Sequence, residues 1–136
     1  MLIVLVTSLS YAQNINIVNG SVYQPLSMEE LMMAARANAY RREMAKQRFE
    51  EYKEKAYTYY NRGDYSGFIY YSNIALNTGW YNDKMYYDRG VAFEMLHEYS
   101  KAKKEYKRAI KKGYYPAQSA YEQCKFHQKT WKKSNK

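Results

Sequence analysis

A chain of 136 residues is long enough for one domain and too short for several of ordinary size. Charged residues make up 26% of it and its mean hydropathy is -0.81, which predicts a soluble protein once any leader is set aside. The single cysteine, Cys124, excludes an intrachain disulfide and a metal site of paired cysteines, so we expect it to be a buried packing residue.

Residues 1–12, MLIVLVTSLSYA, have the pattern of a short secretory leader. Ser10 and Ala12 place small residues around a cleavage site, with Gln13 as the first mature residue. The segment lacks a basic start, and a buried strand is the rival interpretation. The pattern predicts a periplasmic or secreted bacterial protein after leader removal. It also predicts no transmembrane anchor in the mature chain, because the apolar run is too short to span a bilayer.

Residues 13–27 are polar and extended in character, and they predict an extended arm or a small hairpin. Asn19-Gly20 is a favourable pair for a tight turn between two strands. Ser27 and Glu30 then form a capping box, in which a hydroxyl and a carboxylate satisfy free amides at the start of a helix.

A long helix is expected from Met28 towards Asn61, with a possible break near Arg41-Arg42. A second helix is expected over residues 65–77, a third from Asn82 or Asp83 to residue 96, and a fourth over residues 99–112. Pro116 begins a last helix, followed by a frayed tail from Lys129. These elements predict an all-α helical domain over residues 28–130 and a basic tail over residues 131–136.

Turn chemistry separates the predicted helices. Gly63 and Gly113 supply the positive φ that ends a helix, and Asp64 caps the helix that follows it. This local cause explains Arg62-Gly63-Asp64 without the cell-adhesion function known for that tripeptide in integrin ligands. The 18 tyrosines have two interpretations: they fill helix interfaces, or they line a recognition groove.

Residues 83–116 carry small and aromatic side chains where two antiparallel helices must interlock. They are Gly90, Ala102 and Ala109, with Tyr86, Phe93, Tyr99 and Tyr106. This pattern resembles a tetratricopeptide repeat, a helix hairpin of about 34 residues that stacks on its neighbours and binds other proteins. A weaker copy begins near Tyr52. The two copies depart from the family pattern at Phe68, Ser72 and Arg89.

The resemblance implies about two helix hairpins, an N-terminal helical extension and a C-terminal capping helix. It also implies a non-catalytic protein-interaction module, an exported adaptor or assembly factor, with the first helix of each pair lining a concave groove. On this chain the groove residues would be Lys53, Tyr57, Tyr60, Lys84, Tyr87, Val91, Tyr121, Lys125 and Gln128. An aromatic groove with three lysines would suit an extended segment of a protein that is acidic or aromatic.

Residues 101–136 hold 12 lysines and arginines against Glu105 and Glu122, whereas the rest of the chain is close to neutral. An exposed basic face is expected on the fourth helix, made of Lys101, Lys104, Arg108, Lys111 and Lys112. Such a face attracts anionic surfaces or nucleic acid, although a charge run of this kind is often only solvated.

No catalytic or metal-binding pattern is present in the sequence. His97 and His127 have no carboxylate or cysteine at ligand spacing, and no nucleophile has a neighbouring base. The sequence therefore predicts no enzyme, no cofactor and no metal. Two alternatives to groove binding stay open: a structural subunit or homo-oligomer within a larger envelope complex, and a binder of an anionic surface, with nucleic acid the less favoured target.

Overall fold

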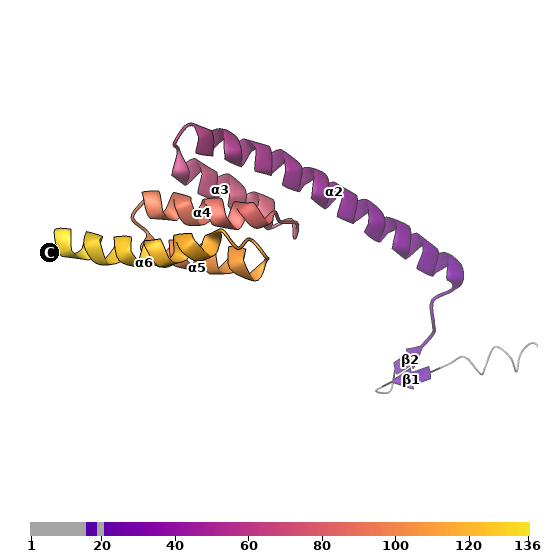
Figure 1. Ribbon diagram of the computed structural model, residues 1–136. Coiled ribbons are helices and arrows are strands. Elements are labelled where there is room, and N and C mark those ends of the chain that lie inside the picture. Colours follow the sequence, from indigo (N-terminus) through magenta and orange to yellow (C-terminus); the bar gives the residue numbers. More distant parts are fainter. Residues whose placement is uncertain (1–15, 19–20) are drawn as a thin grey trace, which may run out of the picture. The chain divides into compact units, whose positions relative to one another are not determined.

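The computed structural model describes residues 16–18 and 21–136, and this part of the chain is almost entirely helical (Figure 1). The all-α prediction, with helix hairpins, is confirmed. The predicted leader, residues 1–12, lies outside the described residues. The elements are β1 (Asn16–Val18), β2 (Ser21–Tyr23), α2 (Met28–Asn61), α3 (Tyr65–Leu76), α4 (Asp83–Met95), α5 (Tyr99–Lys111) and α6 (Ala117–Ser134).

The chain divides into two compact units, one ending at Arg41 and the other beginning at Arg42. In the first, β1 and β2 form an antiparallel pair, with Ile17 opposite Val22. The turn residues expected to join them, residues 19–20, lie outside the described part of the chain.

The capping box at the start of α2 forms as expected. The backbone amide of Ser27 donates to Glu30 Oε2 at 2.7 Å, and the amide of Glu30 donates to Ser27 Oγ at 3.2 Å. These bonds lower the pKa of the Glu30 carboxyl, because the ionised form is the better acceptor. The expected break near Arg41-Arg42 is wrong, since α2 is a single helix from Met28 to Asn61. No glycine or proline interrupts that range, and alanine, methionine, glutamate, lysine and arginine all favour a helix.

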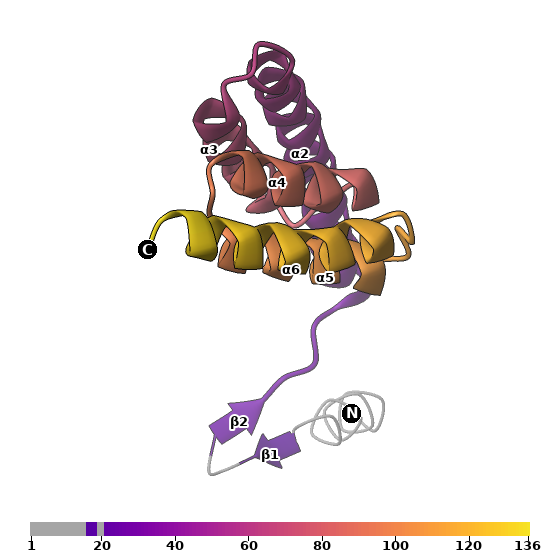
Figure 2. The same ribbon diagram turned by 60° about the vertical axis from the view of Figure 1, so that its left-hand side comes forward.

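The second unit stacks successive helices on one another (Figure 2). Asp64 accepts a 2.8 Å bond from the amide of Gly67 and so caps α3, as predicted, while Gly63 before it takes a φ of 76°. Gly113 ends α5 with a φ of 98°. His97 takes a φ of 59° in the turn between α4 and α5, where a residue other than glycine is unusual. These turns return the chain on itself, so that α4 and α5 form the more closely packed hairpin.

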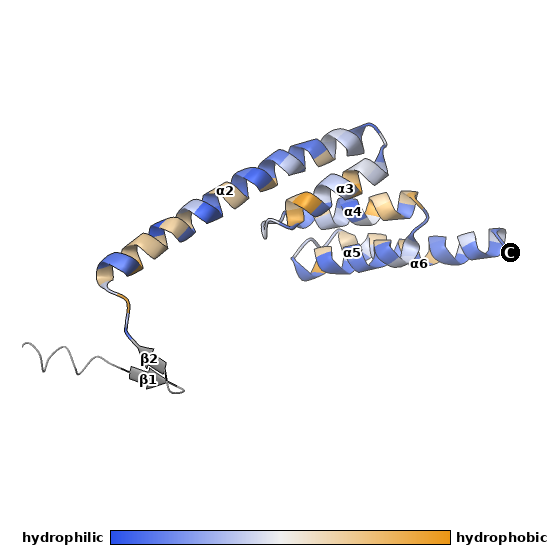
Figure 3. Cartoon of the chain, turned by 180° about the vertical axis from the view of Figure 1, so that it is seen from behind, coloured by the Kyte–Doolittle hydropathy of each residue, from blue (hydrophilic) through white to orange (hydrophobic). Residues whose placement is uncertain are grey.

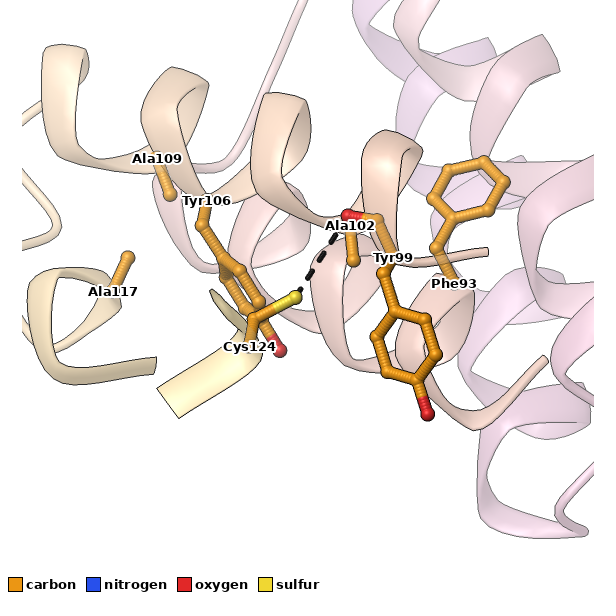
Figure 4. Close-up of a cluster of buried hydrophobic side chains, with 7 residues drawn as sticks. All are labelled: Phe93, Tyr99, Ala102, Tyr106, Ala109, Ala117 and Cys124. Atoms are coloured by element: carbon orange, nitrogen blue, oxygen red, sulfur yellow. Dashed lines mark hydrogen bonds between the residues drawn. The ribbon is translucent and has the colours of Figure 1, made fainter. Parts of the chain in front are cut away.

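Two buried clusters hold this unit together. The first joins α4, α5 and α6 through Phe93, Tyr99, Ala102, Tyr106, Ala109, Ala117 and Cys124 (Figure 4). Alanines let these helices approach closely, and the Cys124 thiol donates to the carbonyl oxygen of Tyr99 at 3.8 Å. The second cluster lies between α2, α3 and α4, where Phe68 is fully buried against the rings of Tyr57 and Tyr60.

The expectation of a frayed tail from Lys129 is wrong, because α6 continues to Ser134. Trp131 provides the physical reason. Its ring stacks on His97 with centroids 3.8 Å apart, and its carbonyl oxygen accepts the amide of Asn135. The last turns of α6 are therefore tied to the α4–α5 turn, and the lysines there lie on an ordered helix.

Candidate recognition groove

Four side chains from α2 and α4 form what we call the tyrosine cluster: Tyr57, Tyr60, Lys84 and Asp88. The Asp88 carboxylate is its centre, with a side chain only 3% exposed. The Tyr57 hydroxyl donates to it at 2.7 Å, and Lys84 Nζ lies 2.9 and 2.7 Å from its two oxygens. The Lys84 ammonium also lies 5.8 Å from the centre of the Tyr57 ring. The buried carboxylate is thus fully paired, and the rings around it are fixed in place.

The environment of the cluster keeps its phenols protonated. Burial, followed by the bond to Asp88, raises the pKa of Tyr57 well above its usual range. Burial and the charge of Asp88 raise the pKa of Tyr60 to about 12. The Tyr57 hydroxyl is occupied by Asp88, so what these two residues offer a ligand is mainly the apolar faces of their rings.

An open cavity of about 520 Å³ continues from Tyr87 and lies among α4, α5 and α6; we call it the α4–α6 cavity. Its walls include Tyr87, Val91, Glu94, Tyr106, Ala120 and His127. Glu94 is the acidic group in this wall: it accepts the Tyr106 hydroxyl at 2.8 Å and pairs with His127 Nδ1. The cavity is thus apolar along Val91 and Ala120 and polar at Glu94.

Some of the residues predicted for the groove meet and others do not. Tyr57, Tyr60 and Lys84 come together around Asp88. The Tyr87 ring instead packs on Tyr106 and Tyr114, and with Val91 it lines the cavity.

Lys53 pairs with Glu50 and lies 5.5 Å from the centre of the Phe49 ring, so its ammonium is already engaged.

Two of the three residues predicted from α6, Tyr121 and Gln128, contact lysines of α5. The Lys107 ammonium lies 5.3 Å from the centre of the Tyr121 ring, and Gln128 accepts a 2.8 Å bond from Lys103. Lys125 lies over the same Tyr121 ring. The α6 residues that line the cavity are Ala120, Gln123 and His127. The predicted α6 residues and the cavity-lining residues therefore lie on adjacent sides of the same helix.

Sequence reasoning missed the acidic groups of the groove. Asp88 follows Lys84 by four residues, a spacing that brings side chains together on a helix, so this pair could have been found. Glu94 and His127 are 33 residues apart, and no local pattern joins them.

The predicted basic face is exposed at all five positions. Part of its charge is paired, since Lys101 contacts Glu98 and Arg108 Nη1 lies 2.7 Å from Glu105. Lys112 lies 3.9 Å from the centre of the Tyr81 ring.

Within residues 16–18 and 21–136, no group of three histidine, cysteine, aspartate or glutamate side chains is placed to hold a metal ion. Cys124 is buried, and burial raises the pKa of its thiol to about 11, so it is a poor nucleophile at neutral pH. Among the helices described, none combines the length and apolar character needed to cross a membrane.

Comparisons of this chain with protein-family models, with curated proteins and with solved structures found no match.

Proposed function

We propose that this protein is a non-catalytic recognition module that binds a segment of another protein across the tyrosine cluster and the α4–α6 cavity. The observation that carries the proposal is an open cavity of about 520 Å³ whose walls include the rings of Tyr87 and Tyr106, the second held by its bond to Glu94. Rigid aromatic rings with hydroxyl groups supply much contact area at little entropic cost, and tyrosine is enriched where binding energy concentrates.

The chemistry of the groove favours a mixed ligand over a purely acidic one. Lys84 is paired with Asp88, and Glu94 adds a second carboxylate at the cavity wall. An extended segment that places an apolar or aromatic side chain against Val91 and Ala120 fits this lining. We therefore favour aromatic anchoring over attraction of an acidic segment.

The setting we propose for this function is the bacterial periplasm or exterior, as the leader-like pattern of residues 1–12 indicates. We also propose that the helix hairpins are of the tetratricopeptide type. The close approach of α4 and α5 at Gly90 and the stacking of α6 on α5 support this assignment.

The test is capture of binding proteins from an envelope extract by the full chain, followed by titration of the protein recovered. Tyr87→Ala removes a ring that lines the cavity, and we expect it to weaken binding by about 1–2 kcal/mol, as loss of an aromatic anchor does. Tyr115→Ala is the matched control, because Tyr115 is 76% exposed and lies in the loop before α6. A thermal melt of each variant separates lost binding from lost folding.

The salt dependence of binding decides between the groove and the basic face. Binding through buried rings changes little with salt, whereas attraction to exposed lysines is screened within about 8 Å at physiological ionic strength. Reversal of Lys104 and Arg108 to glutamate should chiefly slow association. Groove recognition would be refuted if Tyr87→Ala left the affinity unchanged and the charge-reversed variant lost all binding. That result would favour binding to an anionic surface.

A second candidate is a structural subunit that docks through α2. The observation that favours it is the exposure of large apolar side chains in the first half of that helix, among them Met28, Leu31, Met32, Met33 and Tyr40. Stable incorporation into a complex, resistant to dilution and unaffected by Tyr87→Ala, would support this candidate.

A further inference from the structure

One face of α2 exposes apolar side chains at intervals of four, three and four residues; we call it the α2 seam. It consists of Met33, Ala37, Tyr40 and Met44, and the relative exposures of its three large members are 63, 68 and 38%. Hydropathy colouring shows apolar residues recurring along this part of α2 (Figure 3). The spacing is that of the contact positions of a coiled coil, so the seam has the form of one half of a helix pair.

The seam is complementary to itself when a second copy runs in the opposite direction. If the centre of the pairing lies between residues 38 and 39, Met33 of one copy faces Met44 of the other, and Ala37 faces Tyr40. A small residue is then opposite a large one at both central positions, which fills the interface evenly.

The charges beside the seam fit the same arrangement. Arg36 and Glu43 are both exposed and lie seven residues apart, along one edge of the seam. In the antiparallel register, Arg36 of each copy lies next to Glu43 of the other, which gives two ion pairs related by the two-fold axis. A parallel pair would instead place Arg36 beside Arg41 and Ala37 opposite Ala37, leaving like charges together and a gap in the interface.

We propose that the α2 seam binds a second copy of this chain, forming an antiparallel two-helix interface. The edge residues Glu29, Arg36 and Glu43 alternate in sign, which favours a protein partner over an anionic lipid surface, since helices that lie on such surfaces carry mostly lysine and arginine beside the apolar face. The inference is independent of the groove, because it uses only residues of α2 before Ala45.

The first experiment measures the mass of the full chain by light scattering over a hundredfold range of concentration. The expected result is a shift from one to two copies with rising concentration. Tyr40→Glu should weaken association at least tenfold, whereas Leu31→Glu, on the opposite side of the same helix, should leave it unchanged. Arg36→Glu should weaken association, and combining it with Glu43→Arg should restore it.

The second experiment tests the register with thiols placed in the seam and a short thiol-reactive cross-linker. The buried Cys124 is the single native thiol and serves as the unreactive background. An antiparallel pair predicts that Ala37→Cys joins to Tyr40→Cys in a mixture faster than either variant joins to itself.

Three results would overturn the proposal. They are a single copy at every concentration, an equal loss of association with Leu31→Glu, and preferred cross-linking of Ala37→Cys to itself. Binding of the chain to vesicles with anionic headgroups, with loss of that binding in Tyr40→Glu and no dimer in solution, would assign the seam to a membrane surface.

Discussion

Gly90 is the position where the packing of the second unit is most easily broken. A Cβ atom added there would lie 2.5 Å from both Tyr106 Cδ1 and Tyr106 Cε1. Carbon atoms in favourable contact lie about 3.5–4.0 Å apart, so the ring or the helix must move by about 1 Å. The ring has little freedom to do so, because it is 1% exposed and its hydroxyl is bound to Glu94.

Two opposing effects set the size of the change in stability. Overpacking of a buried site costs about 1–3 kcal/mol. Replacing glycine by alanine inside a helix returns about 0.5–1 kcal/mol, because the unfolded chain loses some of its freedom. The expected net loss in the free energy of unfolding for Gly90→Ala is therefore about 1 kcal/mol, or a fall in Tm of about 4–8 °C for a unit of this size. Gly90→Leu adds three more carbon atoms to the same space and should lose about 3 kcal/mol.

The assay is urea unfolding of the wild type, Gly90→Ala, Tyr106→Leu and the double variant, followed by circular dichroism. Once the ring is gone the clash is gone too, so in the Tyr106→Leu background Gly90→Ala should raise stability by about 0.5–1 kcal/mol. The same loss with and without the ring would show that Gly90 is not at a close helix crossing. Such a result would remove the main structural support for a tetratricopeptide-type hairpin.

Four further outcomes are expected. The free energy of unfolding should be constant up to about pH 10, the usual pKa of a phenol, and should then fall as pH rises towards about 12. The reason is that burial raises the pKa of Tyr60 to about 12, so the folded state favours the neutral phenol. Absorbance at 295 nm during alkaline titration reports the phenols that ionise late. Cys124 should react with iodoacetamide at pH 8 about 100-fold more slowly in the folded protein than in urea, since its pKa is raised to about 11. Protein recovered from the native cell should begin near Gln13 by N-terminal sequencing and fractionate outside the cytoplasm. Glu105→Leu should lower the free energy of unfolding by about 3–5 kcal/mol, because it leaves the buried Arg89 guanidinium without its carboxylate partner. Glu105→Leu combined with Arg89→Leu should recover most of that loss in the same urea assay, since the remaining partner of Glu105, Arg108, has a side chain that is 60% exposed.

The helix boundaries could be predicted because local chemistry sets them. Asp64 and Gly113 act through atoms within a few residues along the chain, and their effects are visible in the sequence. The same holds for the capping box at Ser27 and Glu30. The predicted α3 and α5 ends therefore fall within one residue of the observed ones.

The groove could be predicted only where one helix supplies neighbouring residues. Tyr57 and Tyr60 on α2, like Lys84 and Tyr87 on α4, are three residues apart, a spacing that brings side chains together on a helix. The choice of these helix faces rests on the resemblance to a repeat and stays a prediction. The rotation of α6 about its axis depends on how Cys124 and Ala117 pack in the cluster with α5. A rotation equivalent to one residue places His127 in the cavity wall in place of Gln128. The rotation of a helix about its axis is set by packing against its neighbours, and no pattern within the helix sequence predicts it.

Two departures from the repeat pattern are joined to each other in the structure. Arg89 stands where the family has leucine, and Ser72 where it has an aromatic residue, yet Arg89 Nη1 donates to Ser72 Oγ at 2.6 Å. Arg89 Nε also lies 3.1 Å from Glu105 Oε2, and all three residues are at most 5% exposed. A hydroxyl in place of a ring leaves room for the guanidinium, and the guanidinium in turn requires the buried carboxylate, because an unpaired charge there would be strongly destabilising. Together, Ser72, Arg89 and Glu105 form a polar link that fastens α3 to α4 and α5. Agreement with a family pattern is therefore better judged by sets of residues in contact than by each position separately.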